Sequence, residues 1–261
     1  MAFADGSAIL LCGGLTASGT TADVLRIDPS GGTPTVVGRL AHPVHDAGGA
    51  TLGGIDLVLG GGETLQEAFV QRVAASGTGD VVGTLPSPRA DLGAVSIGGQ
   101  LVVVGGGALG TADGRVLVTS DGMNFTVAAM LPHPVRYAGV AVVGGVVLVI
   151  GGEASSGDVR WIQAVDVAAG TARVVGEMPL PLSHATALTL GGVVLVAGGR
   201  VSGRAQQGVE AIDPTTFAVS TVGQLPHARS DAAGVVLDGI GYLIGGESSV
   251  PLTSIVVIRP D

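Results

Sequence analysis

A pair of adjacent glycines recurs through the whole chain at a nearly constant spacing. Each pair follows a short apolar run, and the first glycines of successive pairs are 47, 45, 46, 47 and 47 residues apart. The six pairs are Gly13-Gly14, Gly60-Gly61, Gly105-Gly106, Gly151-Gly152, Gly198-Gly199 and Gly245-Gly246. Self-similarity at a fixed period is the signature of a repeat architecture. The sequence therefore predicts one structural unit repeated six times.

Each unit is expected to contain four β-strands. A further glycine stands six residues before five of the double glycines, namely Gly54, Gly99, Gly145, Gly192 and Gly239. Glycine supplies the positive φ that tight hairpin turns need, so a short strand of small residues and an apolar strand form a hairpin here. A proline-bearing corner such as residues 131–134 precedes the hairpin, and two more strands follow it. Six such units predict an all-β, six-bladed propeller with four-stranded antiparallel blades.

The composition is that of a packed domain. Glycine accounts for 46 of the 261 residues, but there is no Gly-X-Y period, and 46% of the residues are hydrophobic. That hydrophobic content excludes a disordered chain. The uncharged stretch 178–199 is interrupted by Pro179, Pro181 and Gly191-Gly192, so we expect two strands and a turn there and not a membrane-spanning helix.

The charged and metal-binding residue types exclude several functions. All 12 basic residues are arginines, they are scattered, and the formal net charge is −9, which argues against a nucleic-acid partner. Cys12 is the only cysteine, so there is no internal disulfide and no thiolate cluster. His42, His133 and His227 share one corner position, in blades too far apart to hold one ion. We therefore expect no metal and no cofactor.

The repeat resembles the kelch repeat. The hallmarks of that family are a Gly-Gly that ends the second strand of each blade and a P-x-P-R-like lead into the first strand, seen here at Pro86-Ser87-Pro88-Arg89. Most units carry Val or Leu where kelch blades usually have an aromatic residue. The resemblance covers nearly the whole chain and implies a kelch-like propeller, of actinobacterial type by composition. We expect a single domain, 1–261, with blades at about 1–39, 40–84, 85–130, 131–177, 178–224 and 225–261.

The sixth blade is expected to lack its outer strand. The chain stops after residues 252–258, which read as the third strand of that blade, and it starts within the inner strand of the first unit. Our hypothesis is that this is a domain of a longer protein whose upstream residues supply the missing strand.

One face of the propeller is the expected binding region. Successive antiparallel strands alternate in direction, so the corners before each blade and the loops after each double glycine share one face, while short glycine turns form the other. Loops on a rigid scaffold are where function usually lies. The candidate binding residues on this face are Arg89, Asp91, Arg136, Tyr137, Glu153, His184, Arg200, Arg229, Asp231 and Glu247.

Some of these candidates have a structural alternative. Arg89-x-Asp91 and Arg229-x-Asp231 recur at equivalent places, as residues that bond neighbouring blades would do. The glutamates after the double glycines could likewise tie their own loops. Tyr137, His184 and Arg200 break the symmetry of the repeat, as a binding site normally does, and are the first residues to test.

These features favour a non-catalytic binding or sensor domain of a larger bacterial protein, with no catalytic residue assigned. Its partner would be a protein or a small molecule at the channel mouth. The alternative is a small-molecule enzyme, such as a sialic-acid-type sugar mutarotase, that uses Arg and Glu there. A pocket joining Arg and Glu from three or more blades would favour that alternative.

The expected setting follows from composition together with the resemblance to kelch propellers of actinobacteria. The all-Arg, Ala/Gly/Val-rich usage resembles GC-rich coding, and such propellers often lie outside a membrane anchor. We therefore expect a monomeric domain that does not itself span a membrane, in an extracytoplasmic protein that is membrane-anchored or secreted.

Overall fold

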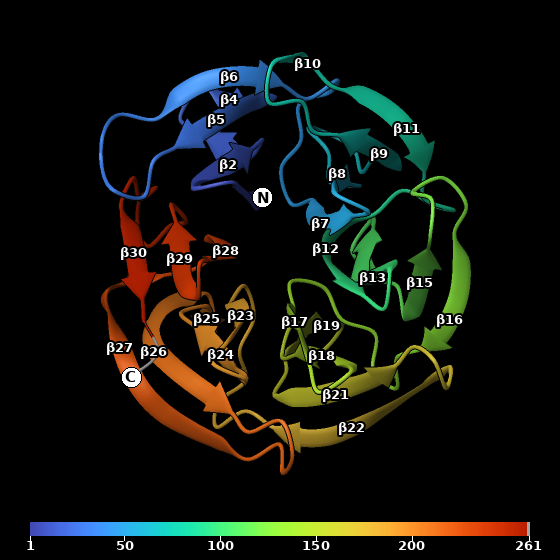
Figure 1. Ribbon diagram of the computed structural model, residues 1–261. Coiled ribbons are helices and arrows are strands. Elements are labelled where there is room, and N and C mark those ends of the chain that lie inside the picture. The colour runs from blue at the N-terminus through green and yellow to red at the C-terminus, as the bar shows by residue number, and fades with distance from the viewer. Residues whose placement is uncertain (260–261) are drawn as a thin grey trace.

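The computed structural model describes residues 1–259, which form β-strands and turns and contain no helix. The strands are arranged in six blades around a central axis, and the chain visits the blades in order around the ring (Figure 1). The first blade, drawn in blue, lies beside the last, drawn in red. The all-β, six-bladed propeller predicted from the repeat is confirmed.

The first three blades each have four main strands, which we give from the axis outward. Blade 1 contains β1 (Ala2–Asp5), β2 (Ala8–Cys12), β5 (Asp23–Ile27) and β6 (Thr35–Arg39). Blade 2 contains β7 (Gly48–Leu52), β8 (Ile55–Leu59), β9 (Phe69–Arg72) and β11 (Asp80–Thr84). Blade 3 contains β12 (Ala90–Ile97), β13 (Gln100–Ala108), β15 (Arg115–Thr119) and β16 (Thr126–Met130). Consecutive strands within each blade are antiparallel.

The last three blades continue this plan, with one strand fewer at the end. Blade 4 contains β17 (Gly139–Val143), β18 (Val146–Ile150), β21 (Trp161–Asp166) and β22 (Thr171–Glu177). Blade 5 contains β23 (Thr186–Leu190), β24 (Val193–Ala197), β26 (Arg204–Ile212) and β27 (Val219–Arg229). Blade 6 contains β28 (Ala233–Leu237), β29 (Ile240–Ile244) and β30 (Ile255–Ile258). Within residues 1–259 the sixth blade thus has three strands, as the sequence predicts.

Short strands in the loops complete the fold. Those that follow the double glycines are β3 (Leu15–Thr16), β4 (Gly19–Thr20), β14 (Thr111–Ala112), β19 (Glu153–Ala154), β20 (Gly157–Asp158) and β25 (Arg200–Val201). In addition, β10 (Gly77–Thr78), from the second blade, pairs in parallel with β6 of the first. The number of strands per sheet therefore varies around the ring.

The apolar core lies between neighbouring blades, at boundaries that we call seams. Between blades 3 and 4, for example, Val102 and Val104 of β13 pack in one cluster with Val147 and Val149 of β18. Each of the six seams in the described part of the chain has such a cluster. The second strand of each blade is covered on both faces, which explains its continuous Val, Leu and Ile.

The double glycines let each blade approach the next one closely. The Gly199 amide donates at 2.8 Å to the carbonyl of Arg229, the last residue of β27, at the corner where the chain enters the following blade. A Cβ added to Gly198 would lie 2.2 Å from the same oxygen, and the φ of Gly198 is +66°. The Gly14, Gly61, Gly106 and Gly152 amides make the equivalent bonds at the preceding four seams. The feature that reveals the repeat is therefore a packing requirement between blades.

Candidate functional site

Five corner residues, one at the entry to each blade from the second to the sixth, surround one end of the axis. They are Asp46, Asp91, Tyr137, His184 and Asp231, and all have a left-handed φ between 52° and 62°. Their backbones are linked in order: each amide from Asp91 onward donates to the carbonyl of the preceding corner at 2.7 to 3.0 Å. A left-handed φ is uncommon for residues other than glycine, although Asp and His adopt it more readily than most, and these bonds hold it in place. We call this end of the propeller the mouth.

Pairing across each blade brings the predicted charged residues to the mouth. The residue before the corner forms an antiparallel bridge with the residue after the double glycine, as in Arg136–Glu153, Ser183–Arg200 and Ser230–Glu247. The two members of each bridge are 17 residues apart in sequence, yet they lie side by side. This pairing places the predicted Arg136, Glu153, Arg200 and Glu247 on one rim.

Arg136 is held between two carboxylates. Its Nη1 lies 3.1 Å from Asp91 Oδ2, and its Nη2 lies 3.1 Å from Glu153 Oε2. The guanidinium carbon is 5.4 Å from the centroid of the Tyr137 ring, within the range of a cation–π contact. Arg136 thus connects the corner of blade 3 to the loop of blade 4.

Arg200 occupies a comparable place between blades 5 and 6. Its Nη2 donates to Glu247 Oε1 and lies 3.1 Å from Asp231 Oδ2. Its Nε donates to Ser230 Oγ at 2.9 Å. Both mouth arginines are therefore already bonded to two carboxylates each.

A stacked pair of rings joins the two arginine clusters. The Tyr137 and His184 rings are parallel within 22°, with centroids 3.8 Å apart, and His184 Nδ1 lies 2.6 Å from Asp231 Oδ1. Burial opposes ionisation of Asp231, but the hydrogen bonds from His184 and Ser230 and the charge of Arg200 outweigh it and lower its pKa. An ionised carboxylate only accepts, so Nδ1 carries the proton. In the neutral ring, Nε2 is then an acceptor.

The other corner carboxyls are harder to ionise. Burial, followed by the charge of Asp46, raises the pKa of Asp91 from 3.8 to about 6, against the opposing effects of Tyr137 and Arg136. Burial also raises the pKa of Asp46. Burial and the Asp91 charge raise the pKa of the Tyr137 hydroxyl. The Asp91 carboxyl at the mouth therefore keeps its proton to a higher pH than an ordinary aspartate does, because its pKa is raised.

Two predicted residues, Arg89 and Arg229, lie elsewhere. Their side chains are buried, with whole-residue exposures of 0% and 1%. Arg89 donates to the Gly105 carbonyl and to Asp113, and Arg229 donates to the Gly245 carbonyl at 2.8 Å. Each side chain therefore bonds to the backbone of the blade that it leads into, at the first glycine of that blade's pair, and not across to a neighbouring blade as the structural alternative expected. The other eight candidates meet at the mouth.

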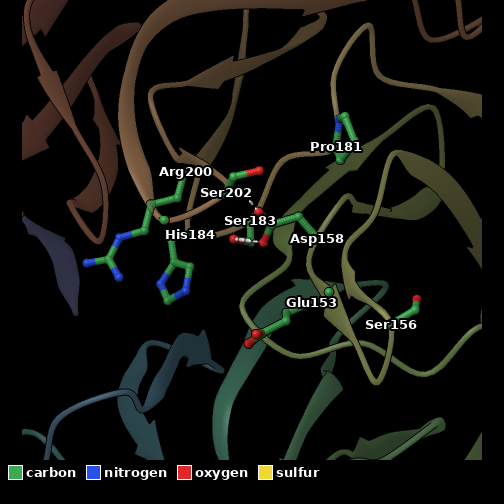
Figure 2. A pocket seen from close by; sticks show the side chains of 10 residues that line it. Glu153, Ser156, Asp158, Pro181, Ser183, His184, Arg200 and Ser202 are labelled. Atoms are coloured by element: carbon green, nitrogen blue, oxygen red, sulfur yellow. Dashed lines mark hydrogen bonds between the residues drawn. The ribbon is translucent and has the colours of Figure 1, made fainter.

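A cavity of about 500 Å³ opens between the loops of blades 4 and 5, beside His184 and Arg200 (Figure 2). Asp158 joins the two loops beside the cavity, because it accepts from Ser183 Oγ at 2.7 Å and from the Ser202 amide at 2.8 Å. Sequence reasoning did not select Asp158, because it lies in a variable loop and has no counterpart in the other repeats. The remaining lining residues are Glu153, Ser156, Gly157, Pro181 and Gly203.

The loops of the other blades end in apolar side chains. Leu15, Leu65, Leu109 and Val250 follow the double glycines of blades 1, 2, 3 and 6, and each is more than half exposed. The face around the mouth thus has apolar loop tips on one side and the polar cavity on the other.

Residues 1–259 contain neither a metal-binding cluster nor a membrane-spanning helix. No three His, Cys, Asp or Glu side chains there are placed to hold a metal ion. No helix of the described chain is both long and apolar enough to cross a membrane.

Comparison with known proteins agrees with this architecture. The model of the kelch motif matches residues 181–226, which begin just before the corner of blade 5 and end within its outer strand β27. The matched segment has the length of one of the six repeat units seen in the structure. The chain is a kelch-repeat β-propeller.

The kelch propeller also resembles solved structures. The one titled "Structure of YjhT" matches with a TM-score of 0.83 and 15% identity, over 100% of this chain and 94% of that one. At this identity the likeness shows a shared fold and nothing about ligands. No curated protein matches the chain.

Proposed function

We propose that this kelch propeller is a non-catalytic binding module that recognises its partner or ligand at the mouth. One observation carries the proposal: the residues that break the repeat symmetry come together. Tyr137 stacks on His184, which is bonded to Asp231 beside Arg200. A scaffold needs no such asymmetric cluster, because the other blades close without one.

The charge pattern supports selective polar recognition. Arg136 and Arg200 are each bracketed by two carboxylates, so neither presents a free positive charge. Such mixed, mutually bonded groups favour specificity over bulk electrostatic attraction. The apolar loop tips nearby would add buried area to a contact with a larger partner.

The enzyme alternative draws on one specific feature. His184 has its Nδ1 fixed by Asp231, which leaves Nε2 for proton transfer in a cavity that also contains Glu153 and Arg200. That geometry suits general acid–base chemistry. However, the cavity joins Arg and Glu from two blades, not three, and Arg200 is already engaged by carboxylates. We therefore favour binding.

Affinity capture with matched variants tests the proposal. Wild type, Arg136→Ala, Tyr137→Ala and Arg200→Ala would be immobilised beside Gln100→Ala, a control on the opposite face. We expect captured proteins or metabolites, measured by mass spectrometry, to be depleted at least about tenfold in the mouth variants only. Species lost in Gln100→Ala but retained in all mouth variants would contradict the proposal. For the alternative, accelerated anomer exchange of a sugar acid, abolished by Glu153→Gln, would favour an enzyme.

A further inference from the structure

The cavity between blades 4 and 5 is shaped for a small ligand. Its volume of about 500 Å³ lies within the roughly 300–1,000 Å³ of small-molecule pockets. Its walls are Glu153, Asp158, His184, Arg200 and small residues, with no large apolar side chain. An apolar ligand would therefore find little surface to cover there.

The pocket is held open by bonds across the seam. Asp158 belongs to the loop of blade 4, whereas its two partners, Ser183 and Ser202, belong to blade 5. These bonds fix the two loops relative to each other before any ligand arrives. A preorganised pocket loses less entropy on binding.

Every charged group that lines the pocket already has a partner in the protein. Glu153 is bonded to Arg136, and Asp158 accepts two hydrogen bonds. Arg200 is bonded to Asp231 and Glu247. An anionic ligand would face carboxylates without a free cation, and a cationic ligand would have to displace an existing partner. The pocket therefore favours neither an anionic nor a cationic ligand.

Hydrogen-bonding capacity nevertheless remains. The second oxygen of Glu153 and the Ser156 and Ser202 hydroxyls make no hydrogen bond within the described chain. The Nε2 of His184 is similarly available. Glu153 and His184 extend into the same open space from opposite sides (Figure 2). These groups suit a partner that both donates and accepts, as a hydroxyl does.

We propose that this pocket binds a neutral polyol about the size of a monosaccharide. Carboxylate oxygens accept from its hydroxyls, while the serine hydroxyls and the histidine complete the contacts. The inference rests on the proposed function, because it names the ligand class for one part of the mouth. Binding of a neutral polyol requires groups that can form hydrogen bonds but carry no unpaired charge, and the pocket has such groups.

Titration by NMR with defined probes tests the ligand class. The neutral probes are myo-inositol, D-glucose and D-galactose, and the charged comparators are N-acetylneuraminate and glucosamine. At least one neutral probe should give saturable shifts of the amides of residues 153–158 and 200–203. Both charged comparators should bind more weakly than that probe.

Variants then test the contacts. Ser156→Ala and Ser202→Ala should each weaken binding roughly fivefold, the effect of one lost hydrogen bond. Ser155→Ala is the matched control, because Ser155 is exposed in the same loop but does not line the pocket. It should leave the affinity unchanged.

Several results would overturn the inference. These are no saturable shift with any neutral probe, tighter binding of a charged comparator, shifts confined to another surface, or equal losses in Ser155→Ala and Ser156→Ala. If none of the neutral probes binds while Arg136→Ala still abolishes partner capture, the ligand class is wrong and the binding function stands. If capture is also unaffected by all mouth variants, both are wrong.

Discussion

Five seams of the propeller differ from the sixth. From blades 1/2 to blades 5/6, the second glycine of each pair donates its amide to a carbonyl of the next blade. At the closing seam, between blades 6 and 1, the described residues make no such bond. There the apolar cluster, in which Ile9 and Ile27 pack with Tyr242 and Ile244, joins the two blades without that bond.

The difference shows what the double glycine does. Where main chain meets main chain, the first glycine has no room for a Cβ, as at Gly198. At the closing seam the nearest atom to a Cβ on Gly245 is 3.4 Å away, an ordinary contact. The first glycine of the pair is thus required by packing at five seams and only by its backbone conformation in the sixth copy, whereas the second glycine there, Gly246, still has no room for a Cβ, which would lie 2.4 Å from the Ser230 carbonyl oxygen.

The largest expected effect separates these two roles. Gly198→Ala should lower the free energy of unfolding by at least about 4 kcal/mol, because its Cβ overlaps the Arg229 carbonyl in addition to the φ strain. Gly245→Ala, with φ strain alone, should cost about 1 kcal/mol. Urea denaturation measures both. Equal losses would show that the seams do not differ in this way.

The second largest loss of stability is expected on substituting a buried arginine. The Arg89 carbonyl accepts from Gly61 across one seam, while its guanidinium holds the Gly105 carbonyl and Asp113. Arg89→Met should cost about 3 kcal/mol, because it leaves the Gly105 carbonyl without this donor in the interior and removes one of the two arginines that bond Asp113, which keeps only Arg115. The matched mouth variant Arg136→Met, at a partly exposed site, should cost less than about 1 kcal/mol. Denaturation curves showing similar losses would place both arginines in the scaffold.

The corner carboxyl Asp91 should give a pH-dependent effect. Its pKa is raised from 3.8 to about 6, so the folded state holds the proton more tightly than the unfolded state. Its contribution to stability is therefore present at low pH and lost as the pH rises from about 4 to 6. Asp91→Asn stays neutral, so its stability relative to wild type should rise over this window by up to about 3 kcal/mol.

Denaturation at pH 4, 5, 6 and 7 checks this expectation. Comparing the variant with wild type cancels the titration of groups common to both. A difference that does not change with pH would contradict the raised pKa of Asp91.

The smallest effect concerns left-handed backbone away from any seam. Leu109 has a φ of 52° and is 88% exposed, so its side chain has little packing to lose. Leu109→Gly should raise the free energy of unfolding by about 0.5–1 kcal/mol. Leu65→Gly, at an exposed loop tip whose φ is not positive, should give no gain. Thermal melts of both variants distinguish relief of strain from a general effect of removing an exposed leucine.

The fold could be predicted because its determinants are local and repeated. An apolar strand that ends in Gly-Gly, with a turn glycine six residues earlier, specifies a hairpin from neighbouring residues alone. Six copies of it specify the number of blades, and chain direction specifies which loops share a face. Chain direction likewise predicted that Arg136, Tyr137 and Glu153 lie on the same face.

The rest depends on contacts between loops that the repeat does not encode. Arg89 and Arg136 both stand at blade entries, but one precedes its corner by two residues and the other by one. Alternate positions of an extended chain face opposite ways, so one side chain is buried and the other reaches the mouth. Asp158 meets Ser202 from 44 residues away. The sequence determined the scaffold through its period, while only the packing of adjacent blades decided which polar side chains meet, because those bonds cross seams between variable loops.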